Sequence, residues 1–574
     1  MRRPHGAALF AAASIVLAGL AAYWNSFQGA FTFDDYGSIV DNPTLRHPWS
    51  IRQLLLPPLS GLTVQGRPLL NLSLAFNYAI GGLHPWSYHA VNLTLHLLAG
   101  LTLFGLVRRT LILPRFQERM GHASTGIAAA VALLWVVHPL QTESVTYIVQ
   151  RAESLAGFLY LLTMFLSLRG FTASRPRGWQ VAAVVACLLG MAAKEVMVSA
   201  PLIVLLFDGL FVESSLRAAF RKRRGFYFAL FLTWGLLATL VVHTGNRGNG
   251  AGFGLGRSSW EYLATQGWAI AHYLRLTFWP HPLILDYGWD VAHGLQDIVP
   301  YAAFIGMLLF ATFSALRGRH WLGFLGAWFF AILAPSSSVV PLVSQTVAEH
   351  RMYLPLAAVV TGAVVGGYLF CTRWRLGRAI PATLVGMLAV VFGYLTAMRN
   401  EDYRSIESIW RDTLRKRPQN SRASSNLGHR LVVEGRLDEA VGIYREAVRM
   451  HPKFEDTHMN LGVALAARGD LAEAIESYRR ALAIEPQFAE ASTHLGLALS
   501  AQGRYAEAIP HYRHALSLQP DAAGTYNNLG DALFKEGRIE EAIAEFRHAL
   551  RLQPESAVIR QNLDTALRRQ PPAR

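Results

Sequence analysis

The chain has 574 residues, of which 52% are hydrophobic and only 16% are charged. A mean hydropathy of +0.25 is too apolar for a soluble protein of this size, and the length exceeds that of one domain. The formal net charge of +15 reflects arginine clusters between apolar stretches, which we interpret as topogenic and not as nucleic-acid-binding. The two cysteines, Cys187 and Cys371, lie inside apolar runs, so no disulfide framework or zinc site is indicated. These features predict a multi-pass membrane protein with a soluble appendage.

Hydropathy predicts eleven membrane spans in residues 1–400. The first span also resembles a signal peptide, but its long apolar core favours an uncleaved anchor. The stretch 260–280 carries Glu261, His272 and Arg275 between tryptophans, and we interpret it as an interfacial or re-entrant helix. The arginine clusters then share one side with the N-terminus, which the positive-inside rule makes cytoplasmic. The expected spans lie near 7–24, 89–107, 125–139, 153–169, 179–194, 197–212, 226–243, 298–316, 320–335, 353–371 and 380–397.

Two adjacent carboxylates, Asp34 and Asp35, follow the first span at the start of an expected outer loop, 25–88. Carboxylates left in hydrocarbon cost several kcal/mol, so this pair must be solvated, paired with cations or used in chemistry. The alternative interpretation is a polar loop with an N-cap for the next helix. The position predicts that a site here reaches water and lipid together.

More charged residues stand at the outward ends of other expected spans. By the predicted topology they face the same side as the acidic pair, and such a group is typical of an active site or a substrate path. The alternative is that pairs such as Lys194 with Glu195 neutralise each other and fix helix packing. The residues are Glu143, Arg151, Lys194, Glu195, Glu349, His350 and Arg351.

One reaction would use an acidic pair and separate arginines at a membrane surface. A sugar carried on a polyprenyl phosphate leaves behind a phosphate whose charge Arg351 or Arg151 could compensate. The acceptor hydroxyl needs a base, and Asp34 or Asp35 could take its proton; such a one-step displacement inverts configuration, by analogy with inverting hydrolysis. The sequence has no phosphate loop on a strand–helix turn, no HExxH and no nucleophile elbow.

After residue 400 the sequence repeats every 34 residues. Prolines recur at Pro418, Pro452, Pro486, Pro520 and Pro554, and glycines at Gly435, Gly469, Gly503 and Gly537. This is the tetratricopeptide period, in which glycine turns helix A into helix B and proline closes each unit. We expect four full repeats over 419–554 with flanking helices, presenting a surface to a protein or peptide. An anchoring or dimerising role is the alternative.

Several motifs together resemble a known family. They are Phe33-Asp34-Asp35 with Asn42-Pro43, Gly66-Arg67-Pro68-Leu69, His84-Pro85, Tyr88-His89, His138-Pro139, Lys194-Glu195 and Glu349-His350-Arg351-Met-Tyr-Leu-Pro355. With the repeats, they look like the transmembrane and tetratricopeptide-repeat (TMTC-type) family. That family resembles the GT-C glycosyltransferases, which use polyprenyl-phosphate sugars, and its eukaryotic members are implicated in O-mannosylation. The resemblance implies a catalytic Asp34 or Asp35 and repeats that select the acceptor; the Arg- and Ala-rich composition suggests a bacterial member.

The sequence therefore predicts an all-α protein, with a GT-C-like membrane domain over 1–400 and an extracytoplasmic repeat domain over 401–574. The expected activity is inverting transfer of a hexose, with mannose as one candidate, from a polyprenyl phosphate to protein Ser/Thr. Expected roles are base for Asp34 or Asp35, phosphate binding for Arg351 and Arg151, and a polar site from Glu143, Lys194, Glu195, Glu349, His350 and His89. No metal ligand set is indicated, and the need for a divalent ion is left open. A non-enzymatic repeat scaffold and a polyprenyl-linked sugar carrier are the alternatives.

Overall fold

The computed structural model describes residues 4–58, 63–244, 258–288, 294–337, 345–377 and 379–570. Across these ranges the chain forms helices, turns and no strand, which confirms the all-α class. The chain divides into two compact units, Met1–Asp412 and Thr413–Arg574, and the division falls inside α18 (Ile406–Lys416). The sequence-based boundary lies twelve residues earlier, at residue 400.

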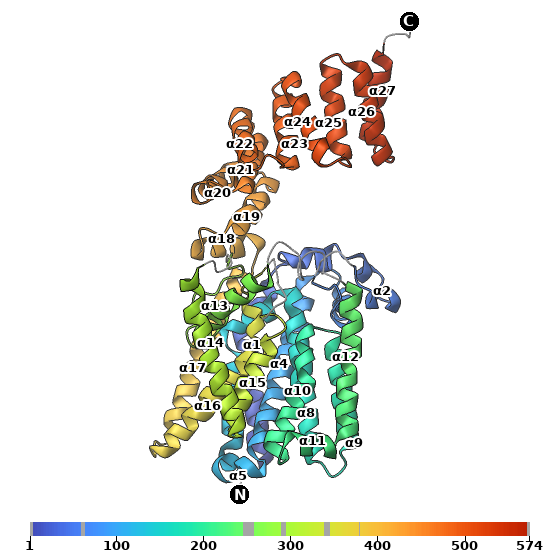
Figure 1. Cartoon of the computed structure of the whole chain (residues 1–574). Helices are drawn as coiled ribbons and strands as arrows, with labels where there is room; N and C mark the ends of the chain where they lie inside the picture. Colours follow the sequence, from blue (N-terminus) through green and yellow to red (C-terminus); the bar gives the residue numbers. More distant parts are fainter. Residues whose placement is uncertain are drawn as a thin grey trace. The chain divides into compact units, whose positions relative to one another are not determined.

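The first unit is a bundle of long helices that run side by side (Figure 1). The connections at one end include α2 (Ile51–Leu55), and those at the other include α5 (Pro114–Met120) and α11 (Leu216–Lys222). The longer helices are α1 (Pro4–Tyr23), α3 (Pro68–Gly81), α4 (Pro85–Leu111), α6 (Ser124–Val136), α8 (Arg151–Thr172), α9 (Arg177–Met191), α10 (Ala200–Phe207), α12 (Arg224–Thr244), α13 (Ser259–Phe278), α14 (Leu295–Arg317), α15 (Trp321–Leu333), α16 (Pro355–Arg373) and α17 (Ala379–Asp402).

Eight helices in the described part of the chain are long and apolar enough to cross a membrane. A bent pair, Pro114–Val136 with Pro139–Thr146, would add a ninth. The two other predicted spans coincide with α9 and α15, which are apolar but have only 15 and 13 residues. The helix at 260–280, α13, does not reach the hydropathy of a span. Length and composition therefore support eight or nine spans where the sequence predicted eleven.

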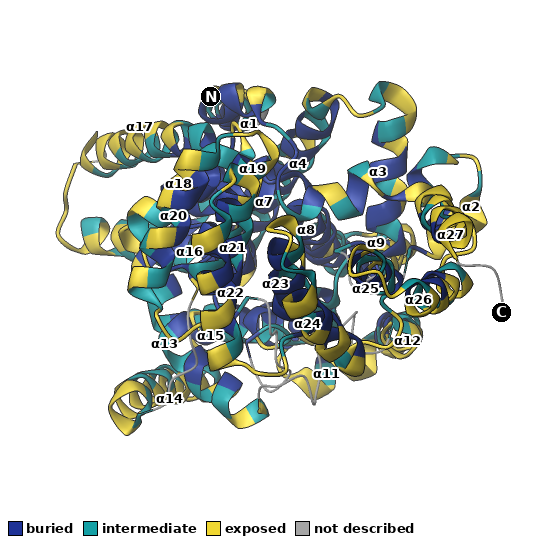
Figure 2. Cartoon of the chain, turned by 90° about the horizontal axis from the view of Figure 1, so that it is seen from above, coloured by how far each residue is buried: buried dark blue, intermediate teal, exposed yellow. Residues whose placement is uncertain are grey.

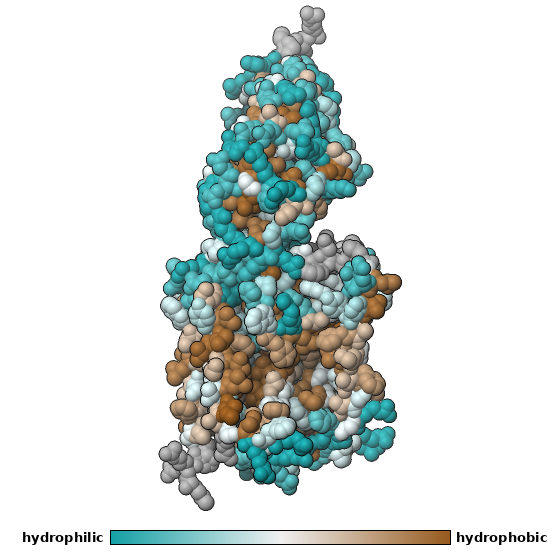
Figure 3. Space-filling model, turned by 90° about the vertical axis from the view of Figure 1, so that its left-hand side faces the viewer, coloured by the Kyte–Doolittle hydropathy of each residue, from teal (hydrophilic) through white to brown (hydrophobic). Residues whose placement is uncertain are grey.

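The outer helices expose apolar side chains around the bundle. The buried share of the most apolar 18-residue window is 0% in Leu295–Arg317 and 6% in Ala379–Asp402. In Ile148–Thr172 it is 61%. Figure 2 shows the exposed residues of α14 and α17 at the periphery, and Figure 3 shows a hydrophobic band across one face of the bundle between more polar ends. Exposed apolar helices of this length are stable in lipid and not in water. The chain is a multi-pass membrane protein.

The connection between α6 and α8 is buried and largely irregular. After α6 ends at Val136, the chain passes through the short helices η5 (Pro139–Gln141), α7 (Thr142–Thr146) and η6 (Ile148–Gln150) before α8 begins. Every residue from 138 to 157 is buried, and many are polar. Irregular backbone at membrane depth is tolerated where it is enclosed by protein, because other groups then satisfy its polar atoms. This 138–150 corner brings polar side chains into the bundle.

The second unit stacks helix pairs in the predicted 34-residue register. Gly469 adopts a left-handed conformation (φ +99°) that ends helix A, as the sequence predicted. Gly462 lies so close to the ring of Tyr478 in helix B that an added Cβ would approach it to 2.5 Å. The helices are α19 (Ser421–Val433), α20 (Leu437–Met450), α21 (Glu455–Arg468), α22 (Leu471–Ile484), α23 (Ala489–Ala501), α24 (Tyr505–Leu518), α25 (Ala523–Lys535), α26 (Ile539–Leu552) and α27 (Ala557–Arg569).

Candidate active site

Four segments far apart in the sequence meet through polar contacts in the first unit. They are the 29–67 loop after α1, the 138–150 corner with the start of α8, the junction at Lys194 and Glu195, and the segment 345–353 before α16. His350 Nδ1 lies 2.8 Å from Glu143 Oε1, although 207 residues separate them. Lys194 Nζ donates to Glu153 Oε1, and Arg67 Nη2 lies 3.2 Å from Glu195 Oε2. These contacts join the four segments into one cluster.

The two adjacent aspartates have different surroundings. Asp35 is fully buried: its Oδ2 accepts from the Thr32 backbone N–H at 2.8 Å and its Oδ1 from that of Val149 at 2.7 Å. Burial raises the pKa of the Asp35 carboxyl to about 8, although the two N–H donors act in the opposite direction. Asp35 thus ties the loop to the 138–150 corner.

Asp34 is only partly buried and lies beside Thr63. The Thr63 hydroxyl is 3.4 Å from Asp34 Oδ2, and the Asp34 backbone N–H donates to the Tyr147 hydroxyl at 2.9 Å. The carbonyl of the same Thr63 accepts from Arg67 Nη1 at 3.1 Å. Asp34 is therefore linked through one residue to the cationic part of the cluster.

Three cations gather in this cluster, namely Arg67, Lys194 and Arg351. Burial lowers the pKa of Lys194 to about 8; the Glu153 carboxylate opposes this shift, and the charges of Arg67 and Arg351 add to it. Arg67 is also buried, and its Nε has no hydrogen-bond partner in the described part of the chain. A buried N–H without a partner is costly, which favours a polar ligand or water at this place.

Arg351 is partly engaged by its own segment. Its Nη1 donates to the Thr346 carbonyl at 2.8 Å and lies 3.4 Å from the Tyr262 hydroxyl, and its Nη2 donates to the Gln345 carbonyl. These contacts fix the guanidinium beside Lys194 and His350. Burial lowers the pKa of His350 well below its ordinary value, so its imidazole is neutral and contributes no charge.

Two carboxylates support the cluster from the inside. Glu143 accepts from both the backbone N–H (2.9 Å) and the ring of His350. Glu349 accepts from the Ile284 N–H at 2.5 Å and the Tyr287 hydroxyl at 2.7 Å, and burial raises its pKa. Both are almost fully buried and have their donors in place, so they orient the 349–351 segment.

Two of the expected site residues hold the fold. Arg151 is fully buried and donates to the Asn92 side chain at 2.6 Å and to the carbonyls of Ser73 and Tyr88, each at 3.0 Å. Each of its three nitrogens donates to an acceptor on α3 or α4, so Arg151 ties these helices to the start of α8. His89 Nε2 lies 3.2 Å from the Gly29 carbonyl, which fixes the start of the outer loop.

Sequence reasoning gave no role to three contributors, Arg67, Glu153 and Tyr147. Arg67 was noted only within a motif, and the hydropathy pattern could not show that it points inward. In the sequence, Arg67 lies between Gly66 and Pro68 and has no carboxylate beside it. This isolation was the available signal that Arg67 has a partner elsewhere in the fold. In the described ranges, no group of three or more His, Cys, Asp or Glu side chains is arranged to hold a metal ion.

The fold and the cluster define a class, that of multi-pass membrane proteins with a buried charged cluster and tetratricopeptide repeats. A tetratricopeptide-repeat family profile matches residues 395–453, 425–488 and 493–557. The chain is 26% identical over 525 residues to human "Protein O-mannosyl-transferase TMTC2". The matched region covers 74% of this chain and 60% of that protein. Human TMTC1 is 27% identical over 75% of this chain and 54% of its own length. The chain is a homologue of the TMTC-type protein O-mannosyl-transferases, which confirms the resemblance.

One local match is stronger. Mouse TMTC1 is 37% identical over 176 residues, which are 29% of this chain and 18% of that protein. The crystal structure of MamA is similar at 24% identity over 28% of this chain and 88% of that chain, with a TM-score of 0.25. The chain spans about 60% or less of the length of the curated relatives named here.

Proposed function

We propose that this protein is an extracytoplasmic-facing membrane glycosyltransferase that moves a hexose from a polyprenyl phosphate to a protein hydroxyl group. The printed names of its relatives support glycosyl transfer and favour mannose as the sugar. The bacterial inner membrane is the expected location. The observation that carries the proposal is the link from Asp34 through Thr63 to Arg67. Through Thr63, a partly exposed carboxylate and a buried cation come close together, as a base and a phosphate ligand must.

Asp34 is the proposed base. The acceptor oxygen attacks the anomeric carbon, the bond from that carbon to the phosphate oxygen breaks, and the acceptor proton passes to the Asp34 carboxylate. Attack opposite to the leaving phosphate inverts the configuration of the sugar carbon. Asp35 is not proposed as the base, because both of its oxygens already accept backbone hydrogen bonds in a fully buried position.

Arg67, Lys194 and Arg351 are the proposed phosphate ligands. The leaving phosphate needs no proton, only compensation of its negative charge, and buried cations supply this more strongly than exposed ones. Glu153 pairs with Lys194, and Glu195 pairs with Arg67. Phosphate would compete with these carboxylates for the cations. Arg151 is not included, because its guanidinium already donates to Asn92, Ser73 and Tyr88.

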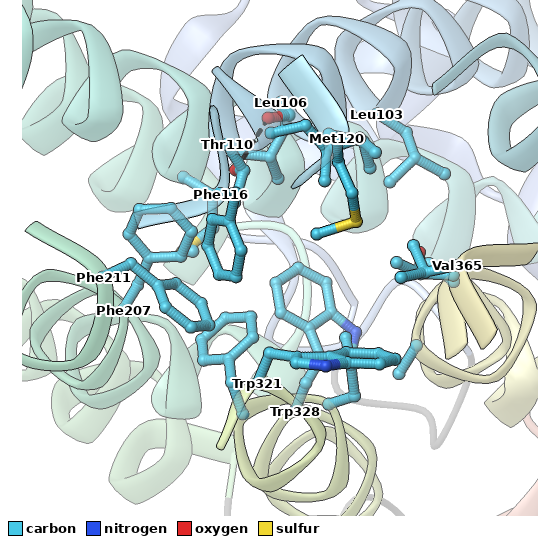
Figure 4. A pocket seen from close by; sticks show the side chains of 18 residues that line it. Leu103, Leu106, Thr110, Phe116, Met120, Phe207, Phe211, Trp321, Trp328 and Val365 are labelled. Carbon is cyan, nitrogen blue, oxygen red and sulfur yellow. Dashed lines mark hydrogen bonds between the residues drawn. The ribbon is translucent and has the colours of Figure 1, made fainter. Parts of the chain in front are cut away.

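An apolar cavity favours a lipid-linked donor. It has a volume of about 90 Å³ and, apart from the hydroxyls of Thr110 and Thr361, its lining is hydrocarbon, aromatic or thioether. Figure 4 shows Phe116, Met120, Trp321 and Trp328 around it. The Trp328 indole on the cavity wall donates to the Leu354 carbonyl at 3.1 Å, three residues after Arg351, while Phe116 and Met120 of the lining come from α5 at the other end of the bundle. A polyprenyl tail would enter it from a phosphate held at the cluster.

The test is sugar transfer by the purified full-length protein from polyprenyl-phosphate mannose to a serine-containing peptide. Asp34→Asn should lose about 10²–10⁴-fold in transfer. Asp41→Asn is the matched control, because Asp41 is an exposed carboxylate of the same loop. Near wild-type transfer by Asp34→Asn would remove the base from the proposal. No transfer by any form, with donor still bound, would favour a sugar carrier, and no donor binding would favour a scaffold.

A further inference from the structure

The turn that carries Asp34 is strained at the residue just before it. Phe33 adopts a left-handed backbone conformation (φ +40°), which is uncommon for a residue with a bulky side chain. The turn closes around Phe33, because the Asp35 N–H donates to the Thr32 carbonyl and the Thr32 N–H donates to Asp35 Oδ2, each at 2.8 Å. Such a conformation persists only where surrounding contacts hold it. The direction of Asp34 therefore depends on what holds Phe33.

The ring of Phe33 packs against a tryptophan from the far end of the first unit's sequence. Trp410 lies edge-to-face with Phe33, with ring centroids 5.6 Å apart and ring planes at 88°. Trp410 is almost fully buried, whereas Phe33 is half-buried. In this geometry the positive edge of one ring meets the negative face of the other, which is favourable beyond the apolar area that is buried. The contact holds the Phe33 ring in one direction.

Trp410 lies in the connector, our name for residues 397–412, which runs from the end of α17 into α18. Arg399 fixes the bend between these helices, because its Nη1 donates to Asp402 at 3.0 Å and to Asp412 at 2.8 Å. Arg399 and Asp412 are both buried, and solvent screens such a pair less than an exposed one. The position of Trp410 is therefore fixed relative to α17.

Side-chain amides join the connector to the residues that follow α1. Asn25 Nδ2 donates to Glu401 Oε1 at 2.8 Å. Asn400 Nδ2 donates to Asn25 Oδ1 at 2.9 Å, and Asn400 Oδ1 accepts from the Thr146 hydroxyl at 2.7 Å. These bonds attach the connector both to the segment that leads into the outer loop and to the 138–150 corner.

The connector also lies beside the tyrosine that binds the Asp34 backbone. The Tyr147 hydroxyl accepts from the Asp34 N–H at 2.9 Å, and the centroids of the Tyr147 and Tyr403 rings are 6.4 Å apart. Trp410 thus contacts the side chain before Asp34, and Tyr403 contacts the partner of the Asp34 N–H. Residues of one short segment support the turn at two points.

We propose that the connector positions the base, and that Trp410 is the positioning residue for Asp34. This inference rests on the function proposed above. Trp410 acts through Phe33 and not on the substrate: it keeps the turn in the left-handed conformation that directs the Asp34 carboxyl group. Transfer depends on such placement, because a reacting group must be held in near-attack geometry. Since α18 begins in the first unit and ends in the second, the base is positioned by the helix through which the repeats are attached.

The first test compares the transfer kinetics of full-length variants in detergent. Trp410→Ala should lower kcat about 10-fold, the value of one aromatic pair, while the KM for donor stays unchanged because Lys194 and Arg351 lie on other segments. Trp410→Phe keeps a ring at the contact and should stay within about 2-fold of the wild-type kcat. Phe226→Ala is the matched control, because it removes another edge-to-face pair, with Phe171 (5.9 Å, 82°), and it should leave kcat unchanged. An unchanged kcat in Trp410→Ala would overturn the proposal.

Two substitutions at Phe33 test the left-handed conformation itself. Both remove the ring, but glycine adopts a positive φ freely and alanine does so only at a cost. Phe33→Gly should therefore keep a kcat about 5-fold higher than that of Phe33→Ala. Adding Trp410→Ala to Phe33→Ala should cost nothing further, because the contact is already lost. Additive losses in the double variant, or equal kcat values for the glycine and alanine variants, would contradict the proposal.

Hydrogen exchange reports on the turn without any catalysis. The backbone N–H groups of Asp34, Asp35 and Tyr36 are hydrogen-bonded, so they exchange slowly while the turn is held. In Trp410→Ala their exchange should be about 10-fold faster, while that of α3 and that of the turn in the control variant stay at the wild-type rate. Unchanged exchange at 34–36, or faster exchange throughout the first unit, would show that Trp410 does not position the turn. If wild-type protein transfers no sugar while Trp410→Ala still loosens 34–36, the glycosyltransferase proposal fails and the hold of Trp410 on the turn stands.

Discussion

Asp34 and Asp35 are neighbours in the chain, but their carboxyl groups have separate partners. The Asp34 carboxylate lies beside the Thr63 hydroxyl at 3.4 Å, whereas the Asp35 carboxylate accepts from the backbone of Thr32 and Val149. Asp35 holds the outer loop against the 138–150 corner, so the backbone that carries Asp34 is fixed as well. One residue supports the position of the other.

Exchanging each aspartate for asparagine should therefore have opposite effects. In Asp35→Asn the amide Nδ2 would face a backbone N–H, so one buried hydrogen bond is lost and the free energy of unfolding falls by about 1–3 kcal/mol. Asp34→Asn removes a charge from a partly exposed group and should leave stability nearly unchanged while it lowers transfer. Thermal unfolding in detergent, measured beside transfer, separates the two.

The opposite pattern would reverse the assignment. If Asp35→Asn unfolds at the wild-type temperature and has lost transfer, while Asp34→Asn keeps transfer, then Asp35 is the base. Asp41→Asn should match wild type in both measurements.

The pH dependence of donor use should report on Lys194. Burial lowers its pKa to about 8, so the ammonium is charged below that pH and neutral above it. A phosphate donor binds the charged form, so kcat/KM for donor should fall as the pH rises through about 8. Lys194→Arg carries a guanidinium that stays charged, and its kcat/KM should remain level to higher pH.

The control for this profile is Lys222→Arg, since Lys222 is exposed and pairs with Glu213 instead. The fall near pH 8 should persist in that variant. A profile that is the same in Lys194→Arg as in wild type would mean that another group titrates, and the proposed phosphate role of Lys194 would be dropped.

The repeat unit was the part best predicted from sequence. Its contacts are local, so a 34-residue period with glycine at Gly469 and a small residue at Gly462 specifies the turn and the close approach of the helices. The membrane unit was predicted less completely. Hydropathy locates apolar stretches, but it does not distinguish a 13-residue helix such as α15 from a full span.

The composition of the cluster shows why sequence could not assign its roles. Topology put Glu143 and His350 on one side of the membrane, and the structure brings them to 2.8 Å. The sequence could not tell which way an arginine points: Arg151 turns inward to three acceptors from α3 and α4, while Arg67 joins the carboxylate of Glu195. Such pairing depends on long-range packing, which no local pattern contains.

Topology can be tested with reporter fusions. The arginine-rich loops alternate only if 260–280 does not span, so the chain should cross the membrane an odd number of times before residue 398. A reporter that is active only outside the cytoplasm should be active when fused after residue 398 and inactive when fused after Arg378. Fusions that report the reverse would place the repeats in the cytoplasm and exclude an extracytoplasmic acceptor site.

Filling the apolar cavity should impair the use of long-chain donors selectively. Ala358 lines the cavity on α16, and Ala358→Leu would occupy space that the tail needs. If the added leucine keeps about two methylene groups of the donor tail out of the cavity, the lost burial costs about 1.6 kcal/mol. This corresponds to a roughly 15-fold lower kcat/KM for a long-chain donor. A short-chain donor that does not reach the cavity should be used as well as by wild type. Ala363→Leu adds the same volume to an exposed position on the same helix and should change neither donor. An equal loss with both donors in Ala358→Leu would indicate a general packing defect, and no loss with either would place the tail elsewhere.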